Sequence, residues 1–194
     1  QGAARARGTH RRDEARLRPP PQAGVPDLNA GSVRILRLGA GHDRTKFTCG
    51  VHALDRYFQE QVSQDERRRV TACFVAVDPQ GSVLGYYTLA SASVALDDLP
   101  SPLAGKLPRY PTVPVVRLGR LAIARDAQGG GLGGALLADA LVRVAQSEIG
   151  AYAMVVDAKD EQAVAFYRHH GFLPLASSPL QLFLPLASVA KLVR

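Results

Sequence analysis

The order of predicted elements places this chain of 194 residues in the α/β (α+β) class, as one layered sheet with helices packed against it. Two observations support this assignment. Apolar and β-branched residues first form an antiparallel hairpin at 71–77 and 83–94, joined by the turn sequence Asp78-Pro79-Gln80-Gly81. A strand, a glycine-rich turn, an amphipathic helix, a second strand and a second helix then follow between residues 115 and 171.

The N-terminal part divides into a tail and the start of a folded domain. Residues 1–32 have no apolar periodicity and carry six arginines against three acidic residues, so we expect a disordered tail before a domain at 33–194. A short strand is predicted near 33–38, a turn at Cys49 and Gly50, and a helix over 52–63. The polar stretch 64–69 follows that helix. Five prolines predict a loop over 96–114.

The C-terminal part alternates strands and helices. Residues 115–124 read as a strand, and 131–146 as a helix with Leu132, Leu136, Ala140 and Val144 on one face. A strand at 152–156 precedes a helix at 160–169, which Gly171 ends as a C-cap. Strands at 172–175 and 180–186 complete a mixed sheet.

Composition narrows the class of protein. The formal net charge is +7, which suits either an anionic partner such as phosphate or nucleic acid, or simply a soluble basic surface. No apolar run is long enough for a transmembrane helix, and no secretory signal is present. Two distant cysteines form neither a disulfide framework nor a metal site, so we expect a cytoplasmic protein without a metal.

The glycine-rich segment 128–134 predicts an anion-binding loop. Glycines let backbone N–H groups converge on a ligand, and the start of the following helix adds a positive partial charge. The sequence lacks the Gly-Lys-Ser/Thr of a Walker loop. A dinucleotide-binding loop would need the first strand of a parallel unit, whereas here an antiparallel hairpin comes first. A merely flexible turn is the remaining alternative.

Two motifs resemble those of the GNAT superfamily of N-acetyltransferases. Residues 128–133, Gln-Gly-Gly-Gly-Leu-Gly, are similar to its acetyl-CoA loop, and 160–172 resemble its second motif, with Asp160 where the family often has Asn. Segments 47–50, 54–58, 85–89, 118–122 and 178–184 are similar to GNAT toxins of toxin–antitoxin pairs. The resemblance covers about residues 33–190 and implies a largely antiparallel, twisted GNAT-like sheet.

The resemblance implies acetyl-CoA as co-substrate, lying where the strand that ends near Ile123 separates from the strand at 152–156. It assigns Tyr167 as the general acid, since a phenol stays protonated at pH 7 and can donate to a thiolate. The alternative is that Phe166 and Tyr167 are both packing aromatics. The residues that the resemblance places against acetyl-CoA are Leu121, Ala122, Ile123, Gln128, Gly129, Gly130, Gly131, Leu132, Gly133, Gly134, Asp160 and Ala163.

The toxin resemblance further implies that the acceptor is the α-amino group of aminoacyl-tRNA, that acetylation blocks translation, and that a ribbon-helix-helix antitoxin neutralises the protein. A homodimer is a further expectation. Acetylation of a protein N-terminus or small amine, or a non-catalytic acyl-CoA- or nucleic-acid-binding module, are the alternatives. A tRNA acceptor would need cationic side chains, and the candidates are Arg67, Arg68, Arg69, Arg109, Arg117 and Arg120.

Overall fold

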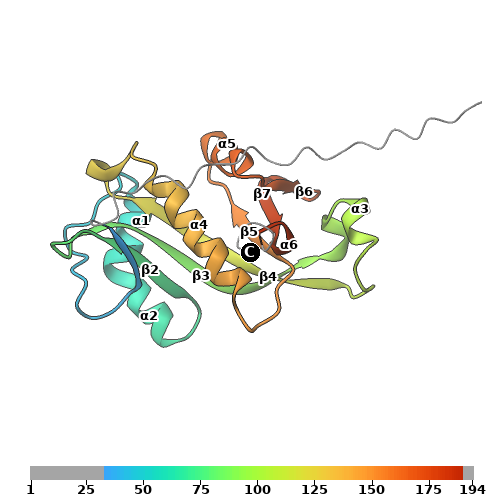
Figure 1. Cartoon of the computed structure of the whole chain (residues 1–194), viewed down its shortest axis with the longest axis horizontal. Coiled ribbons are helices and arrows are strands. Elements are labelled where there is room, and N and C mark those ends of the chain that lie inside the picture. The colour runs from blue at the N-terminus through green and yellow to red at the C-terminus, as the bar shows by residue number, and fades with distance from the viewer. Residues whose placement is uncertain (1–32, 190–194) are drawn as a thin grey trace, which may run out of the picture.

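The computed structural model describes residues 33–189, which form a seven-stranded sheet with helices on both faces (Figure 1). The strand order is β1-β2-β3-β4-β5-β7-β6. β4 and β5 run parallel, whereas all the other neighbouring strands are antiparallel, which confirms the predicted fold class. The predicted tail at 1–32 lies outside the described residues. The strands are β1 (Arg34–Arg37), β2 (Ala72–Val77), β3 (Val83–Ala95), β4 (Thr112–Ile123), β5 (Ala153–Asp157), β6 (Leu173–Leu175) and β7 (Ser178–Pro185).

Nine helical segments are assigned within the described residues. Three of them follow one another without a break and extend the helix predicted at 52–63 as far as Arg67: α1 (His52–Arg56), the π-helical η1 (Tyr57–Gln61) and α2 (Val62–Arg67). The polar stretch 64–69 is therefore mostly helical. The others are η2 (Leu96–Asp98), α3 (Ser101–Ala104), η3 (Arg125–Ala127), α4 (Leu132–Ala145), α5 (Glu161–His169) and α6 (Leu186–Val189).

The prediction of a loop over 96–114 is wrong at both ends of that range. It begins with η2 and α3, and β4 already starts at Thr112, so that Pro114 lies inside a strand. Tyr152 N–H donates to Pro114 O, which shows that the main-chain groups of Pro114 face the β5 side. β5 starts only opposite Val115, so the missing N–H of Pro114 removes no ladder hydrogen bond.

Three apolar clusters fill the two faces of the sheet. The α4 cluster joins α4, α5 and α6 to one face through residues such as Leu118, Leu136 and Val156. The α1–α2 cluster covers the opposite face over β2, β3 and the end of β4. The α3 cluster covers that same opposite face over β5 and β7, because Val155 and Phe183 alternate with residues of the α4 cluster.

The two helices beside the proposed cofactor loop form for local reasons. α4 buries Leu132, Leu136, Ala140 and Val144, which recur every fourth residue, as predicted. α5 is capped at both ends. The Asp160 carboxylate accepts the Ala163 N–H, and Gly171, at φ +88°, follows the last turn.

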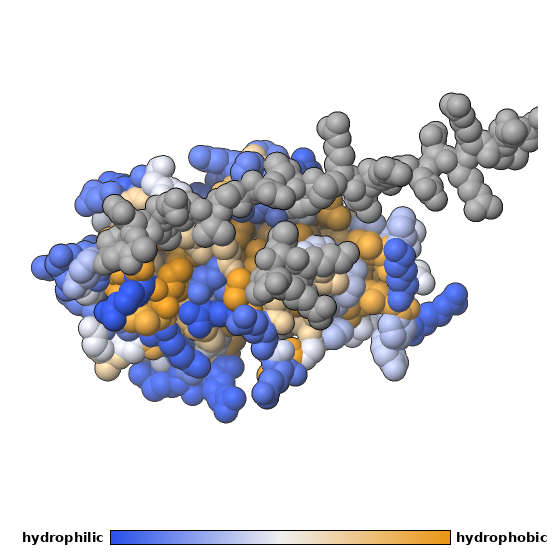
Figure 2. Space-filling view, viewed as in Figure 1, coloured by the Kyte–Doolittle hydropathy of each residue, from blue (hydrophilic) through white to orange (hydrophobic). Residues whose placement is uncertain are grey.

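Apolar residues are exposed at both edges of the sheet. Figure 2 shows apolar residues gathered toward the β1–β2 end and again toward β6 and α3, with polar residues around the rim. The edge strands each expose a leucine, Leu36 on β1 and Leu173 on β6, at 38% and 40%. Unpaired strand edges of this kind are sites where another chain can add.

Candidate active site

The sheet forks between β4 and β5. The two strands pair only from Val115 to Leu118 and from Ala153 to Val156, while β4 continues to Ile123. The separation of these strands that the resemblance implied is therefore present in the structure. Beyond Leu118, one edge of β4 has no neighbouring strand on the β5 side among the described residues.

Main-chain groups of β4 face this fork at alternate residues. Ala124 N–H donates to Leu84 O on β3. By alternation the peptide groups of Ala122 also face β3, whereas those of Leu121 and Ile123 face the fork. Of the three positions predicted to hold pantetheine through the backbone, Leu121 and Ile123 have groups on the correct side. The main-chain groups of Ala122 are directed at β3, so its contact with acetyl-CoA stays a prediction that these groups do not support.

The first half of the glycine loop is open to a ligand. Gly129 and Gly131 have φ angles of +81° and +80°, and a Cβ built on either would meet nothing within 4 Å. α4 begins immediately afterwards at Leu132 with no side-chain cap. The N–H groups of its first turn are therefore left for an anion, which suits a pyrophosphate.

The second half of the loop packs against α5. A Cβ on Gly133 would lie 3.7 Å from the Phe166 ring, and one on Gly134 would lie 3.2 Å from His170 Nε2. These two glycines let the start of α4 approach α5 closely, a role that the sequence analysis did not foresee. The His170 ring is held there by a 2.8 Å contact between its Nδ1 and Phe166 O.

Two predicted cofactor residues have their polar groups occupied by the protein itself. Gln128 Nε2 lies 3.0 Å from both Cys49 O and Ile123 O, so its side chain joins the end of β4 to the turn before α1. Asp160 Oδ1 accepts the Ala163 N–H at 2.8 Å, and this bond lowers the pKa of Asp160. Contact of these residues with acetyl-CoA stays a prediction, and the bond to Asp160 already uses the Ala163 N–H.

Tyr167 lies on α5 among the apolar residues of the α4 cluster. It is 8% exposed, with Phe166 and Phe172 rings beside it. Burial raises its pKa to about 12, and the negative charge of Asp157, at the end of β5, adds to the shift. Tyr167 is thus a fully protonated donor at neutral pH. Its buried cluster also contains Leu118 and Val156, the last residues at which β4 and β5 pair, so the Tyr167 side chain lies on the side of the fork that α5 covers.

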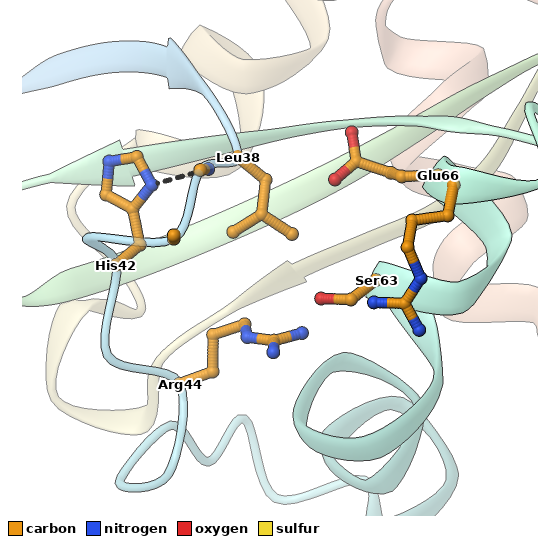
Figure 3. A pocket seen from close by; sticks show the side chains of 8 residues that line it. Leu38, His42, Arg44, Ser63 and Glu66 are labelled. Atoms are coloured by element: carbon orange, nitrogen blue, oxygen red, sulfur yellow. Dashed lines mark hydrogen bonds between the residues drawn. The ribbon is translucent and has the colours of Figure 1, made fainter.

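The predicted cationic residues do not form one patch. Arg67, Arg68 and Arg69 are exposed at the end of α2, and Arg109 is exposed between α3 and β4. Figure 1 shows α2 and α3 at opposite ends of the molecule. Arg67 also lines a cavity of about 240 Å³ between α2 and the loop after β1, together with Arg44, His42 and Ser63 (Figure 3).

Arg117 and Arg120 are occupied by contacts within the protein. Arg117 forms an ion pair with Asp157 across the fork, and the Arg120 guanidinium lies 3.4 Å from the centre of the Tyr57 ring. The interpretation of these two as free phosphate-binding cations is not supported by these contacts. Sequence reasoning missed both partners because they come from distant segments.

Metal binding and membrane insertion were both considered for residues 33–189. In that range no three His, Cys, Asp or Glu side chains are grouped so that they could bind a metal ion. None of its helices has the length and apolar composition to cross a membrane.

A sheet that forks beside an uncapped helix and an open glycine loop defines an acyl-CoA-dependent transferase site. The chain matches the model of the Acetyltransferase (GNAT) family over residues 42–172, and it belongs to that family. It is related to tRNA-acetylating toxins. It is 37% identical over 159 residues to a tRNA-acetylating toxin of Mycobacterium tuberculosis, covering 81% of this chain and 94% of the relative. It is 31% identical over 162 residues to a probable toxin TacT of Sinorhizobium fredii, covering 78% and 90%.

Solved structures of the toxin AtaT have the same fold. AtaT complexed with acetyl-methionyl-tRNAfMet superposes with a TM-score of 0.78 at 33% identity, covering 84% of this chain and 99% of that one. A structure of AtaTR bound with acetyl-CoA gives a TM-score of 0.73 at 33% identity, with the same coverage. A Tyr→Phe mutant of AtaT bound to the C-terminus of the antitoxin AtaR gives 0.70 at 30% identity, covering 82% and 97%.

Proposed function

We propose that this chain transfers the acetyl group of acetyl-CoA to the α-amino group of aminoacyl-tRNA and thereby blocks translation. The observation that carries this proposal is the fork between β4 and β5, with the open glycine loop at one end and Tyr167 in the buried cluster that contains the last paired residues of the two strands. The similarity of this chain to tRNA-acetylating toxins supports aminoacyl-tRNA as the acceptor.

The residues at the fork fit acetyl-CoA. The N–H groups at the start of α4 and the open space over Gly129 and Gly131 suit its pyrophosphate. The main-chain groups of Leu121 and the N–H of Ile123 suit the amide groups of an extended pantetheine arm, which would add to β4 as a strand does, while the Ile123 carbonyl already accepts from Gln128. Bound acetyl-CoA supplies an activated acetyl thioester.

The chain itself contributes orientation and one proton. The Leu121 N–H, at the fork, is placed to polarise a thioester carbonyl. Tyr167 donates its phenolic proton to the sulfur that leaves, and its raised pKa keeps that proton in place at neutral pH. An α-amine, whose ordinary pKa is about 7.7–8.0, is partly neutral at pH 7 without help, unlike a lysine amine near about 10.4.

We also infer the partners. A positive surface around Arg67 and its cavity is the region that we assign to the tRNA backbone. A ribbon-helix-helix antitoxin would neutralise the enzyme, in line with the antitoxin-bound structure of AtaT. The exposed edges of β1 and β6 are where we expect an antitoxin segment or a second copy of the chain to add.

Expression in a bacterium followed by mass spectrometry of its tRNA tests the proposal. We expect growth arrest and an acetyl group on the amino acid that is esterified to tRNA. The same extracts should show no new acetylation of protein N-termini. Acetyl groups on protein N-termini with unlabelled charged tRNA would contradict the proposed acceptor and leave the acetyl-CoA site intact.

A further inference from the structure

A polar stripe crosses the sheet on the face covered by α1, α2 and α3. It consists of Arg117 and Arg120 on β4, Asp157 on β5 and Gln181 on β7. Arg120 stacks on Tyr57 at the boundary of the α1–α2 cluster, while Arg117 lies opposite Val155 of the α3 cluster. The two apolar clusters on this face are therefore separated by charged and amide groups.

The centre of the stripe lies at the fork. Asp157 follows the last residue of β5 that pairs with β4, and its Oδ2 accepts a hydrogen bond from Arg117 Nη1. Gln181 Nε2 donates to Asp157 Oδ1 at 2.7 Å. The carboxylate is thus fixed from both sides, yet its side chain remains 46% exposed and that of Arg117 33% exposed. Each carboxylate oxygen keeps a further lone pair for a ligand.

Asp157 and Tyr167 approach the fork from opposite faces of the sheet. Asp157 continues the alternation of Ala153 and Val155, which belong to the α3 cluster, whereas Tyr167 belongs to the α4 cluster. Tyr167 shares its buried cluster with Leu118 and Val156, the last residues at which β4 and β5 pair, and Asp157 directly follows Val156. A carboxylate therefore lies on the side of the fork opposite the proton donor.

We propose that Asp157 is the anchor for the acceptor α-amino group, held in position by Arg117 and Gln181. This inference rests on the proposed acetyl transfer at the fork. An amine N–H that donates to Asp157 would place its nitrogen at the end of β5, across the fork from Tyr167.

Arg117 has a second role in this arrangement. A lone carboxylate would stabilise the ammonium form and hinder attack, because an opposite charge favours the charged state. The Arg117 guanidinium balances that charge, so the pair accepts a hydrogen bond from a neutral amine. The ammonium first loses one proton to solvent. As the N–C bond forms and the C–S bond breaks, Tyr167 gives its proton to sulfur, and the second amine proton restores Tyr167.

The competing interpretation is that the ion pair only joins β4 to β5. A half-exposed ion pair contributes little to stability, so variants at Asp157 should fold. The experiment compares two acceptors: the aminoacyl-tRNA that the wild type acetylates, and the same tRNA carrying the corresponding acid without its α-amino group, which has no donor for Asp157. If the wild type labels a peptide N-terminus instead, that peptide and its desamino counterpart replace them.

Asp157→Asn tests the anchor. A hydrogen bond to a charged group corresponds to roughly 10- to 100-fold in affinity. We expect the wild type to bind the amine acceptor more tightly than the desamino one by about that factor, and the variant to lose this preference while its KM for acetyl-CoA is unchanged. Asp97→Asn makes the same change at an exposed residue of η2 and should leave both values as in the wild type.

Arg117→Gln tests the charge balance. It leaves Asp157 without its cation, so the pH profile of kcat should move to higher pH, a change that a purely structural ion pair would not produce. Retention of the amine preference in Asp157→Asn would overturn the proposal, as would an equal rise in the KM for acetyl-CoA. Labelling of a different amine contradicts only the proposed acceptor, because the same comparison with a desamino analogue still applies to that amine.

Discussion

Removing the phenolic hydroxyl of Tyr167 separates catalysis from packing. In the structure the ring lies between Phe166 and Phe172, and its hydroxyl has no hydrogen-bond partner within residues 33–189. Tyr167→Phe keeps these ring contacts. We therefore expect the free energy of unfolding to change by less than about 1 kcal/mol and the affinity for acetyl-CoA to be unchanged.

Turnover should fall much further than stability. General acid catalysis is typically worth about 10²–10⁴-fold, or about 3–5 kcal/mol of activation free energy. With its pKa raised to about 12, Tyr167 remains protonated throughout the neutral range. The wild-type rate should accordingly show no loss that is due to this acid between about pH 7 and pH 10.

The assay measures acetyl transfer to charged tRNA under saturating substrates, with calorimetry of acetyl-CoA binding and thermal unfolding beside it. Tyr152→Phe is a matched control, because Tyr152 is a partly buried phenol at the opposite end of β5. Near-normal turnover in Tyr167→Phe would refute the role of general acid. A loss of turnover matched by a similar loss in Tyr152→Phe would show that the effect is structural.

Three other predictions concern the cofactor loop, the RNA surface and the tyrosines. Gly130→Val places a side chain over the open loop at a residue whose φ is not positive. We expect the KM for acetyl-CoA to rise at least about tenfold while the melting temperature is unchanged. Gly150→Val, at an equally open position, should change neither the KM nor the melting temperature. Arg67→Glu should raise the KM for charged tRNA and lower the dependence of log K on log salt by about one. Arg109→Glu, at the other end of the molecule, should change the KM for charged tRNA and its salt dependence less than Arg67→Glu does. Equal effects of the two variants would contradict the assignment of the region around the Arg67 cavity to the tRNA backbone. Burial raises the pKa of five tyrosines and does so most for four of them. The stabilising effect of these four is present below their ordinary pKa near 10 and is lost as the pH rises through the raised values. Between the ordinary and the raised pKa, each of these tyrosines should make the free energy of unfolding fall by about 1.4 kcal/mol per pH unit. Circular dichroism reports unfolding and tyrosinate absorbance reports deprotonation. Deprotonation of all tyrosines before the chain unfolds would contradict this expectation for Tyr57, Tyr86, Tyr87 and Tyr167.

The fold was predictable because its signals are local. The β2–β3 hairpin follows from apolar and β-branched runs on both sides of Asp78-Pro79-Gln80-Gly81, and α4 from apolar residues at every fourth position. The strand that begins before Pro114 was not predicted, since its tolerance of proline depends on where β5 starts. The continuation of the first helix to Arg67 was missed because its last turn is polar and exposed.

The site was predictable only where a single segment builds it. The glycine loop follows from its glycines before an amphipathic helix, which predict an anion site, and Tyr167 was found through the resemblance of residues 160–172 to a GNAT motif. Contacts between distant segments were not visible in this way. Gln128 bonds the Cys49 carbonyl, and Arg120 stacks on Tyr57, so both residues looked available in the sequence and are occupied in the structure.

Asp157 shows why the acceptor side of the fork cannot be read along the chain. Nothing in its neighbours along the sequence distinguishes it, and its place depends on three strands that meet in one register. Parallel pairing with β4 brings Arg117 beside it, antiparallel pairing with β7 places Gln181 opposite it, and the end of β4–β5 pairing at Leu118 leaves it open. A shift of one residue in either register would turn its side chain to the Tyr167 face. The donor side of this active site is therefore encoded in motifs, whereas the acceptor side is encoded in strand register.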